Sequence, residues 1–513
     1  MNIENFVWTL PSIVLLTGCP SPGINGAHCS LLEGDATCAA LGTLLPYCSA
    51  GCKNSPFGNG CVAEQPPPSC HSPCGGGLTA EELDECPEPT SGTGPAPTTG
   101  MGTTAGDELP SMTATGADDT TTGPAPGCRD DASCPAASPF CREDTCVPCS
   151  ATDDPNAACV ESFPDRPLCV EDACVACTAE DTSACEGATP ACDVPTGTCV
   201  ACTRHGQCPD SACHLEAGSC LPVDRVWWVD GDARDCGIAD GSEASPYCTF
   251  ADAMANIGVG QLGTLRVAAR EFGAAYAENL VLAAGRVVAV LSADEEPPRL
   301  TGSGIGAPIT VSGGAVAYLQ GGRVEGSLGT HAISVVGSVL HLHEFRVVLN
   351  VGGGIALTNG ALLQADNSVL GANGNALVDA QALRVTDSSF DLRYVTLAGN
   401  DGTAVSSILC TGASNGSIRN GIVVGVQTGS VDCPDLVVET SATDSAFMGE
   451  GVVPVGTFDV AWFVSPGSGD FHLADGHPFT DVARWEVGDP PVDLDGDRRP
   501  SRAGSPDVAG ADR

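Results

Sequence analysis

From about residue 225 to the end of the chain, short apolar runs alternate with turn residues such as Gly, Asn and Asp. Three columns of positions recur there with a nearly constant repeat. The first column consists of Val324, Val347, Val369 and Phe390. The second precedes it by seven residues and consists of Ala317, Leu340, Leu362 and Leu383. The third precedes it by five residues and consists of Leu319, Leu342, Gln364 and Val385.

Short strands with a constant repeat length are typical of stacked coils rather than of a β-sandwich. We therefore expect each column to stack like on like inside a parallel solenoid, with the intervening residues pointing outward. Gln364 is the one polar residue in these columns, and inside the solenoid it would need a hydrogen-bond partner.

Residues 128–220 carry a different repeat, which is built on cysteine. Four groups of four cysteines follow one another at similar intervals. The groups are Cys128, Cys134, Cys141 and Cys146; Cys149, Cys159, Cys169 and Cys174; Cys177, Cys185, Cys192 and Cys199; and Cys202, Cys208, Cys213 and Cys220. A hinge, CVPC or CVAC, joins each group to the next. Tandem disulfide knots are favoured over zinc sites, because this stretch has only two histidines, His205 and His214.

Two further segments precede these repeats. Residues 19–86 hold eight cysteines after Cys19 and show little periodicity, which predicts a small disulfide-held module whose pairing the sequence leaves open. Residues 87–127 are rich in Thr, Pro and Gly and contain no aromatic or basic residue. Such a segment cannot bury enough apolar surface to fold, so we expect a disordered tether that spans about 35 Å.

Composition places the chain outside the cytoplasm. It has 29 cysteines and a single lysine, Lys53, and aromatic residues make up 4%. So many cysteines suit an oxidising compartment, where disulfides hold together segments that are poor in apolar residues. The formal net charge of −43 argues against a nucleic-acid partner, and against a polyanionic substrate unless cations bridge the two.

The N-terminal residues contain the membrane-directed segment. Residues 6–18 (FVWTLPSIVLLTG) have the length of a signal-peptide core and end in small residues. The four residues LTGC that end at Cys19 resemble the bacterial lipobox, in which cleavage before the cysteine is coupled to diacylglycerol attachment on its sulfur. Acylation of Cys19 would leave an even number of cysteines, which can all pair. The alternative interpretation is a short buried helix with a cysteine in the core.

The lipobox resemblance implies a signal peptide over residues 1–18 and a lipid anchor as the link to the membrane. Pro20 stands where many lipoproteins of the inner membrane carry an aspartate. This favours the outer membrane or the cell surface of a Gram-negative bacterium as the location of the exported chain.

The ends of the C-terminal region resemble a known superfamily. The segment WWVDGDARDCGIADGSEASPYCTFADAMANI (residues 227–257) looks like the opening strand, loop and capping helix of the pectin-lyase-like superfamily. Residues 271–282 are similar to the first full coil of its members, and residues 469–483 and 492–512 resemble the segment that closes the solenoid. The resemblance implies a mainly β fold, a right-handed parallel β-helix over residues 225–513. Cys236 with Cys248 and Cys410 with Cys433 are candidate disulfides.

The superfamily includes polysaccharide lyases, glycoside hydrolases and esterases, and also surface proteins without a reaction, so the fold alone does not decide the function. Its lyases use an Arg or Lys base beside calcium, but no lysine follows Lys53, and no acid cluster aligned with an arginine across consecutive coils is evident. Asp387 and Asp391 come nearest to a hydrolase pair, although solvated turn residues are the simpler interpretation.

Two histidines and one acidic run are further candidate metal ligands. His341 and His343 alternate with apolar residues, so both side chains are predicted to point to solvent, and exposed polar residues are favoured over a metal pair. Asp493, Asp495 and Asp497 place three carboxylates at alternate positions around a glycine, like the start of a calcium loop, but no glutamate follows at the twelfth position. A plain acidic turn is favoured over bound calcium.

The sequence therefore predicts a lipid-anchored surface protein with no certain cofactor. A disulfide module, a tether and four cysteine-rich repeats would carry a β-helix head. We expect the head to bind or scaffold a glycan or another surface protein without catalysis. The alternative is a polysaccharide lyase or glycoside hydrolase, which an arginine with two acids on one outer face would indicate. A third interpretation makes the repeats the binding part and the head a spacer.

Overall fold

The computed structural model describes residues 128–513, except 376, 378, 403–404, 428, 445–446 and 448, and the backbone of two short strands near the N-terminus. These strands, β1 (Tyr47–Cys48) and β2 (Cys61–Val62), form an antiparallel pair. They belong to a first compact unit, Met1–Pro110. The cysteine-rich repeats and the C-terminal region belong to a second unit, Ser111–Arg513. The predictions for Cys19, the signal peptide and the tether lie outside the described residues. Within the part of the chain described, no helix is long and apolar enough to cross a bilayer.

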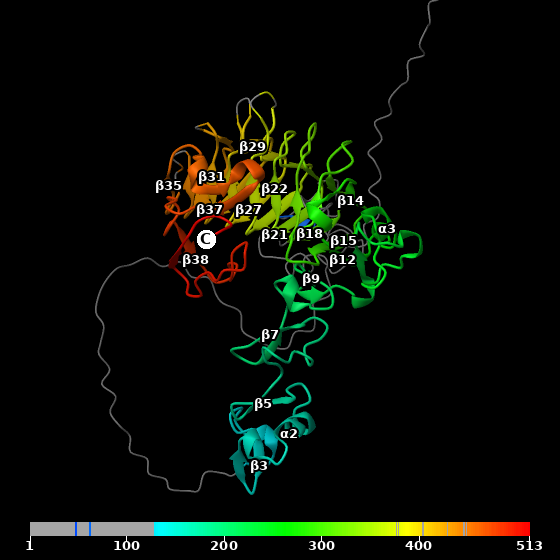
Figure 1. Ribbon diagram of the computed structural model, residues 1–513. Helices are drawn as coiled ribbons and strands as arrows, with labels where there is room; N and C mark the ends of the chain where they lie inside the picture. Colours follow the sequence, from blue (N-terminus) through cyan, green and yellow to red (C-terminus); the bar gives the residue numbers. More distant parts are fainter. Residues whose placement is uncertain are drawn as a thin grey trace, which may run out of the picture. The chain divides into compact units, whose positions relative to one another are not determined.

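Each cysteine-rich repeat ends in a two-stranded antiparallel hairpin (Figure 1). The hairpins are β3 (Phe140–Arg142) with β4 (Thr145–Val147), β5 (Leu168–Val170) with β6 (Ala173–Val175), β7 (Ala191–Asp193) with β8 (Thr198–Val200), and β9 (Cys213–His214) with β10 (Ser219–Cys220). The second repeat also has helix α2 (Pro155–Ser162), and short 3-10 turns η2 (Asp131–Ser133), η3 (Cys149–Ala151) and η4 (His205–Gln207) begin three of the repeats.

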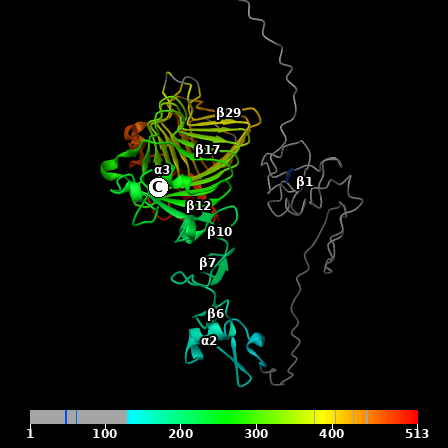
Figure 2. The same cartoon turned by 90° about the vertical axis from the view of Figure 1, so that its right-hand side faces the viewer.

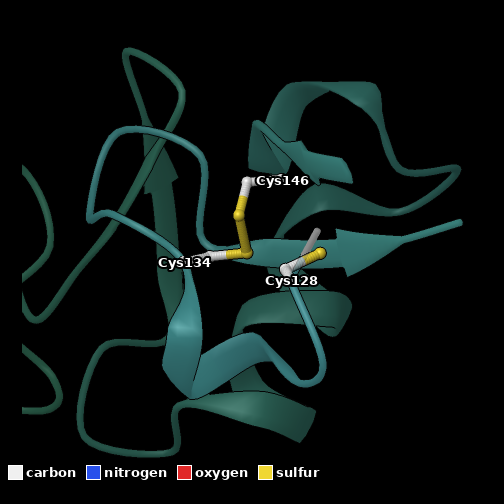
Figure 3. A group of neighbouring side chains, drawn as sticks. All are labelled: Cys128, Cys134 and Cys146. Atoms are coloured by element: carbon white, nitrogen blue, oxygen red, sulfur yellow. A yellow bond between two sulfur atoms is a disulfide. The ribbon is translucent and has the colours of Figure 1, made fainter. Parts of the chain in front are cut away.

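The four repeats share one disulfide pattern, in which the first cysteine bonds the third and the second bonds the fourth. Figure 3 shows the Cys134–Cys146 bond of the first repeat beside Cys128. The third and fourth cysteines face each other across each hairpin, so the pattern clamps both strands. Three sulfurs of each repeat lie within 4.8 Å of one another. Since these cysteines are disulfide-bonded, the disulfide interpretation holds and zinc is not needed.

The C-terminal region is a parallel β-solenoid with three sheets (Figures 1 and 2). Sheet A consists of β11 (Val226–Val229), β12 (Leu262–Val267), β15 (Val287–Ser292), β18 (Val316–Gln320), β21 (Val339–His343), β24 (Leu362–Asp366), β27 (Ser389–Arg393), β30 (Asn415–Arg419) and β33 (Leu436–Glu439). Sheet B consists of β13 (Ala275–Tyr276), β16 (Arg299–Leu300), β19 (Arg323–Val324), β22 (Arg346–Val348), β25 (Val369–Gly371), β28 (Thr396–Ala398), β31 (Ile422–Val424), β34 (Ala442–Thr443) and β35 (Val453–Pro454). Sheet C consists of β14 (Leu280–Leu282), β17 (Ile309–Ser312), β20 (Ile333–Val336), β23 (Ile355–Thr358), β26 (Leu383–Thr386), β29 (Ile408–Thr411) and β32 (Val431–Asp432). The predicted mainly β fold, a parallel solenoid preceded by a disulfide-rich region, is confirmed.

The predicted interior columns are right for the first two coils and wrong after them. Ala317 pairs with Leu340, and Leu319 with Leu342, as expected. In the next coil the inward residues are Leu363 and Ala365, so the predicted register is off by one position there. Because side chains alternate between the two faces of a strand, this shift places Gln364 on the outer face, where it needs no internal partner. Phe390 then stacks on Leu363, because a long turn between β25 and β26 lengthens that coil.

A ladder of buried asparagines runs beside the apolar interior, at the turn that follows sheet B. Asn350, Asn373 and Asn400 are fully buried. The side-chain amide of Asn350 donates to Asn373 (3.0 Å), and that of Asn373 donates to Asn400 (3.2 Å). Their amides also donate to main-chain carbonyls of neighbouring coils. The ladder therefore satisfies polar main-chain groups that the turn would otherwise bury without partners.

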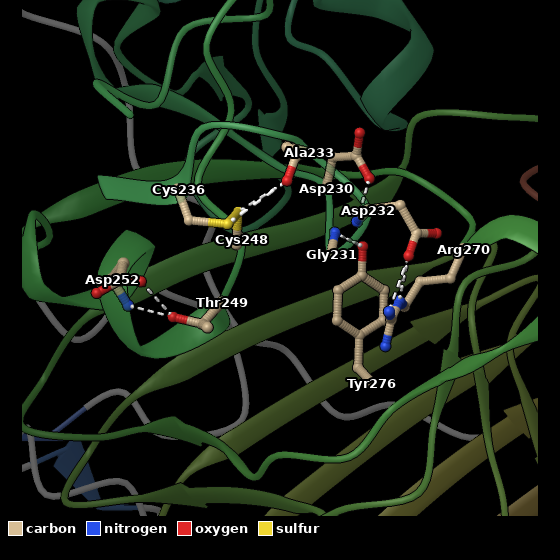
Figure 4. Close-up of a disulfide and its surroundings, with 10 residues drawn as sticks. All are labelled: Asp230, Gly231, Asp232, Ala233, Cys236, Cys248, Thr249, Asp252, Arg270 and Tyr276. Carbon is tan, nitrogen blue, oxygen red and sulfur yellow. Dashed lines mark hydrogen bonds and ion pairs between the residues drawn. A yellow bond between two sulfur atoms is a disulfide. The ribbon is translucent and has the colours of Figure 1, made fainter. Parts of the chain in front are cut away.

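The N-terminal end of the solenoid is covered by β11, a loop and helix α3 (Phe250–Ala255). The Thr249 side chain accepts a hydrogen bond from the main chain of Asp252 and so caps this helix (Figure 4). The inner side of the helix buries Phe250, Ala253 and Met254 against the first coils. This end of the solenoid is thus closed by apolar packing, as the sequence resemblance implied.

The C-terminal segment packs on the flank of the solenoid rather than across its end, which differs from the expected closing role. It contains β36 (Phe463–Ser465), β37 (Asp470–Leu473), β38 (Ala483–Trp485) and β39 (Ser505–Asp507), with the turns η8 (Val460–Trp462) and η9 (Pro466–Ser468). Phe463, Phe471 and Phe479 of this segment form one buried cluster with outward-facing residues of sheet B, such as Val348 and Ile422. The outer face of sheet B is apolar from Val348 onward, so this segment keeps that part of the face from water.

The fourth cysteine-rich repeat packs on the outer face of sheet A. Ala212 and Leu221 of the repeat form an apolar cluster with Ala289, Leu291 and Tyr318 of the solenoid. The phenol of Tyr318 lies 3.1 Å from His214. This repeat is therefore fixed to the first coils of the solenoid.

Candidate binding cleft

A cleft of about 830 Å³ lies where three separate parts of the chain meet. The fourth repeat around His205 and Pro209 and the acidic loop around Asp495 form its walls, and the outer face of sheet A forms its floor. The floor comes from successive coils of sheet A, with Arg266, Leu291 and Gln320 at matching positions of β12, β15 and β18. The remaining lining residues are Gly206, Cys208, Ser292, Asp294, Glu295, Pro297, Gly321, Glu344, Arg346, Leu494 and Gly496.

Partners within the protein already hold most of the charged groups that line the cleft. Arg266 donates to the carbonyl oxygens of Pro209 (3.2 Å) and Ser211 (3.0 Å) in the fourth repeat. Arg346 faces Asp495 at 3.6 Å. Burial lowers the pKa of both arginines, because desolvation disfavours their charged form. Four carboxylates and two arginines line the cleft, so it favours uncharged or cationic ligands over anionic ones.

His343 stands at the edge of the cleft between two carboxylates. Its Nδ1 contacts Asp366, and its Nε2 lies 3.4 Å from Glu344, which also accepts a hydrogen bond from Gln320 (3.2 Å). Partial burial by itself would lower the pKa of His343, but the two carboxylates outweigh it and raise the pKa to about 10. The imidazole is therefore charged at neutral pH, and it serves as an ion-pair partner rather than as a base.

We expect a His343→Gln variant to lose stability in a pH-dependent way. The pKa is higher in the folded state than the ordinary value near 6.5, so protonation favours folding. The stabilisation is complete below pH ~6.5 and is lost as the pH rises through about 10. The urea midpoints of the variant and of the unchanged protein should therefore differ most at pH 6 and converge by pH 10.5. A difference that stays constant over this range would contradict the assigned ion pairs.

Beyond His343, a polar strip continues along the outer face of sheet A. Asp366 on β24 pairs in register with Arg393 on β27, and Asp391 lies on the same strand as Arg393 with 3.5 Å between carboxylate and guanidinium. Ser417 on the next coil donates to Asp391 (2.6 Å). An arginine and two acids thus meet on one outer face, contrary to the sequence-based interpretation. This coil is longer than the two coils directly before it, which hid the alignment of these residues along the sequence.

The predicted hydrolase pair, Asp387 and Asp391, does not form. Asp387 is an exposed turn residue with a left-handed backbone (φ 49°), and its side chain accepts a hydrogen bond from the main chain of Ala413 (2.9 Å). Asp391 instead points outward from β27 toward Arg393 and Ser417. The two carboxylates therefore make separate contacts, as expected for Asp387 as a turn residue.

The predicted solvent exposure of His341 is wrong, although its side chain points outward as expected. The imidazole is buried, with its ring 4.7 Å from that of Tyr318 and its Nε2 3.9 Å from Glu216 of the fourth repeat. His205 also packs edge-on against Tyr318. The physical reason is that the fourth repeat covers this part of sheet A. Burial, reinforced by nearby positive groups, lowers the pKa of His205 to about 4, so this histidine is neutral.

The three carboxylates of the acidic loop have separate roles. Asp493 is buried and accepts hydrogen bonds from the main chain of Asp495 (3.0 Å) and Asp497 (2.9 Å), and burial raises its pKa. Asp495 turns to His472 (3.0 Å), and this contact raises the pKa of that histidine to about 9. Asp497 is exposed. Among the described residues, every group of three side chains that could hold a metal is made of cysteines.

Both candidate disulfides of the head are formed. Cys236 and Cys248 are joined across the loop before α3 (Figure 4). Cys410 on β29 is joined to Cys433, one coil later. Each bond closes a loop at one end of the solenoid, which restricts the unfolded chain.

Sequence reasoning missed Gln320 and Arg346, which line the cleft. Both belong to outward positions of their strands, and Arg299, Arg323 and Arg346 follow one another at matching positions of sheet B. Their nearly constant spacing along the chain was a readable signal. The cleft itself could not be predicted from the sequence, because the residues of its walls come from distant parts of the chain.

Comparisons with known proteins give one partial family match and distant structural likenesses. Residues 113–226, which contain the four cysteine-rich repeats, match a family of unknown function (DUF8331). Among curated proteins, none matches the chain significantly. A rhamnogalacturonan lyase superposes with a TM-score of 0.27 and 12% identity, over 43% of this chain and 74% of its own. The pectate lyase Pel9A superposes with a TM-score of 0.26 and 12% identity, over 57% of this chain and 97% of its own.

Proposed function

We propose that the protein is an exported, lipid-anchored surface protein whose head binds an extended, uncharged glycan. The observation that carries this proposal is the cleft between the fourth repeat, sheet A and the acidic loop. Acylated Cys19 would fix the chain to the outer membrane, and the tether and repeats would hold the head away from it. A surface protein as ligand is the alternative partner.

The charges of the cleft support binding in preference to catalysis. Arg346, Glu344 and His343 already make ion pairs or hydrogen bonds with one another or with Asp495 and Asp366, so none of them is held ready to exchange a proton with a ligand. The excess of carboxylates and the net charge of −43 disfavour a polyanionic chain. Carboxylate, amide and carbonyl groups suit the hydroxyls of a neutral sugar.

A polysaccharide lyase or hydrolase is the second candidate function. The polar strip favours it, since Asp366, Asp391 and Arg393 supply the arginine and two acids that such a reaction uses. The strip lies next to the cleft but does not line it. Binding in the cleft and chemistry on the strip can therefore be separated by substitution.

We expect a Gln320→Trp variant of the full chain to lose glycan binding. Gln320 lies on the floor of the cleft, and a bulky ring there would fill the space that a sugar occupies. The probes are soluble cellohexaose, xylohexaose and mannohexaose, and calorimetry measures their binding with and without calcium. The hexasaccharide that binds the unchanged protein most tightly should show no detectable binding to Gln320→Trp. Without calcium, hexagalacturonate should bind neither the variant nor the unchanged protein, because it is anionic.

Gln364→Trp is the matched control, since Gln364 also points outward from sheet A but lies beside the polar strip. It should leave binding intact. Loss in Gln364→Trp alone would move the site to the strip, and new reducing ends or unsaturated products from any probe would make the second candidate correct. In Gram-negative cells fed labelled palmitate, the unchanged protein should incorporate the label and Cys19→Ser should not; incorporation that persists in Cys19→Ser would contradict the lipid anchor.

A further inference from the structure

Phe272 is the only aromatic side chain of the described chain that is fully exposed, with a relative exposure of 102%. Every other Phe, Tyr and Trp side chain described is buried or half-buried. The backbone of Phe272 is also in the left-handed region, at φ 57° and ψ 25°. This region is unfavourable for residues with a bulky side chain, so the position is strained as well as exposed.

The turn that carries Phe272 is held firmly in place. The main chain of Glu271 donates to Asp232 (2.6 Å), and Arg299 donates to the carbonyl of Gly273 (2.6 Å). Asp232 in turn pairs with Arg270 (2.8 Å), whose guanidinium lies over the ring of Tyr276 (Figure 4). A fixed turn thus presents an aromatic ring that contributes nothing to the core.

This turn lies one coil away from the rim of the cleft. Ala275 pairs with Arg299, so residues 271–274 lie beside residues 295–298 of the next coil. The main chain of Ala269 donates to Asp294 (2.8 Å), which links the two turns directly. Asp294, Glu295 and Pro297 line the cleft. A chain that leaves the cleft over this rim would therefore meet the ring of Phe272.

We infer that Phe272 is a stacking platform for a pyranose ring of the glycan that the cleft holds, an inference that rests on the proposed function. Aromatic faces carry partial negative charge and attract the polarised C–H groups of a sugar face. Glu271 and Glu295 flank the platform, so an uncharged sugar suits it better than a uronate. The structure thereby points to neutral pyranose units with an apolar face as the ligand class.

The test compares Phe272→Ala, Phe272→Gly and Phe272→Trp in the full chain, with the tightest of the three neutral hexasaccharides as the probe. Phe272→Ala and Phe272→Gly should bind about tenfold more weakly, the loss expected for one aromatic stacking contact. Phe272→Trp should bind as tightly as the unchanged chain. Because glycine adopts positive φ freely, Phe272→Gly should not lower the melting temperature.

Ile305→Ala is the control, since Ile305 is 80% exposed on the turn between β16 and β17. It should not alter binding. Unchanged binding in Phe272→Ala, with binding abolished in Gln320→Trp, would overturn the platform and leave the proposed function standing. A lower melting temperature of Phe272→Gly, or an equal loss in Ile305→Ala, would also overturn it. If the unchanged chain bound none of the hexasaccharides, both the function and the platform would be wrong.

Discussion

We expect an Arg499→Met variant to lose about 3–5 kcal/mol of stability, the cost of depriving a buried charge of its buried partner. The Arg499 side chain is fully buried and pairs with Asp507 at 3.2 Å, whose side chain is equally buried. It also donates to the carbonyls of Gly510 (2.9 Å) and Ala511 (3.0 Å) and lies 3.9 Å above the ring of Tyr394. The substitution would remove the buried partner of Asp507 and leave this carboxylate with the partly exposed Arg513. Thermal unfolding followed by circular dichroism should show a fall in melting temperature of about 10 °C.

Arg513→Met is the matched control for this prediction. Arg513 pairs with the same Asp507 at 3.3 Å, but its side chain is 43% exposed, so water replaces the lost partner. It should change stability by less than about 1 kcal/mol. A double variant, Arg499→Met with Asp507→Leu, removes both buried charges and should recover part of the loss. Equal effects of Arg499→Met and Arg513→Met would show that the buried pair does not stabilise the C-terminal segment.

An Asn373→Leu variant should lose about 3 kcal/mol, although leucine has a similar volume. Asn373 donates to Val347 (2.8 Å) and to Asn400 (3.2 Å), and its carbonyl accepts from both the main chain and the side chain of Asn350. Leucine would leave these groups of three coils buried without partners. Urea unfolding of both chains measures the difference.

Asn375→Leu is the control, because Asn375 lies two residues later in the same turn and is only half-buried. Its side chain accepts one hydrogen bond, from the main chain of Leu377 (2.8 Å). We expect a loss of less than about 1 kcal/mol. If Asn373→Leu were no more harmful than this control, the ladder would not stabilise the coils.

The packed fourth repeat links these stability features to the proposed function. Its residues His205 and Pro209 line the cleft, and the carbonyl of Pro209 accepts a hydrogen bond from Arg266 of the solenoid. The fourth repeat and the solenoid therefore line one cleft, whereas the interpretation in which the repeats bind and the head is only a spacer treats them as separate. The polar strip does not line this cleft, so we expect substitutions in the cleft and on the strip to have separable effects.

The sequence by itself determined the class of the fold and the local units that build it. The repeat of apolar positions predicted stacked coils, and the columns from Ala317 to Leu340 and from Leu319 to Leu342 have the predicted register. The cysteine groups predicted disulfide knots, and all four have the same pairing. These features depend on contacts between neighbouring units with a nearly constant spacing, so the pattern along the chain is enough to reveal them.

Only the tertiary structure decided which residues share a surface. The lengthened turn after β25 brought Asp366 opposite Arg393, and the register of β24 turned Gln364 outward. The fourth repeat buried His341, and the acidic loop reached Arg346 from a distant position in the sequence. Such contacts depend on loop lengths and on long-range packing between segments with no common repeat. For this reason the sequence indicates that His341 points outward, but only the packed structure shows what covers it.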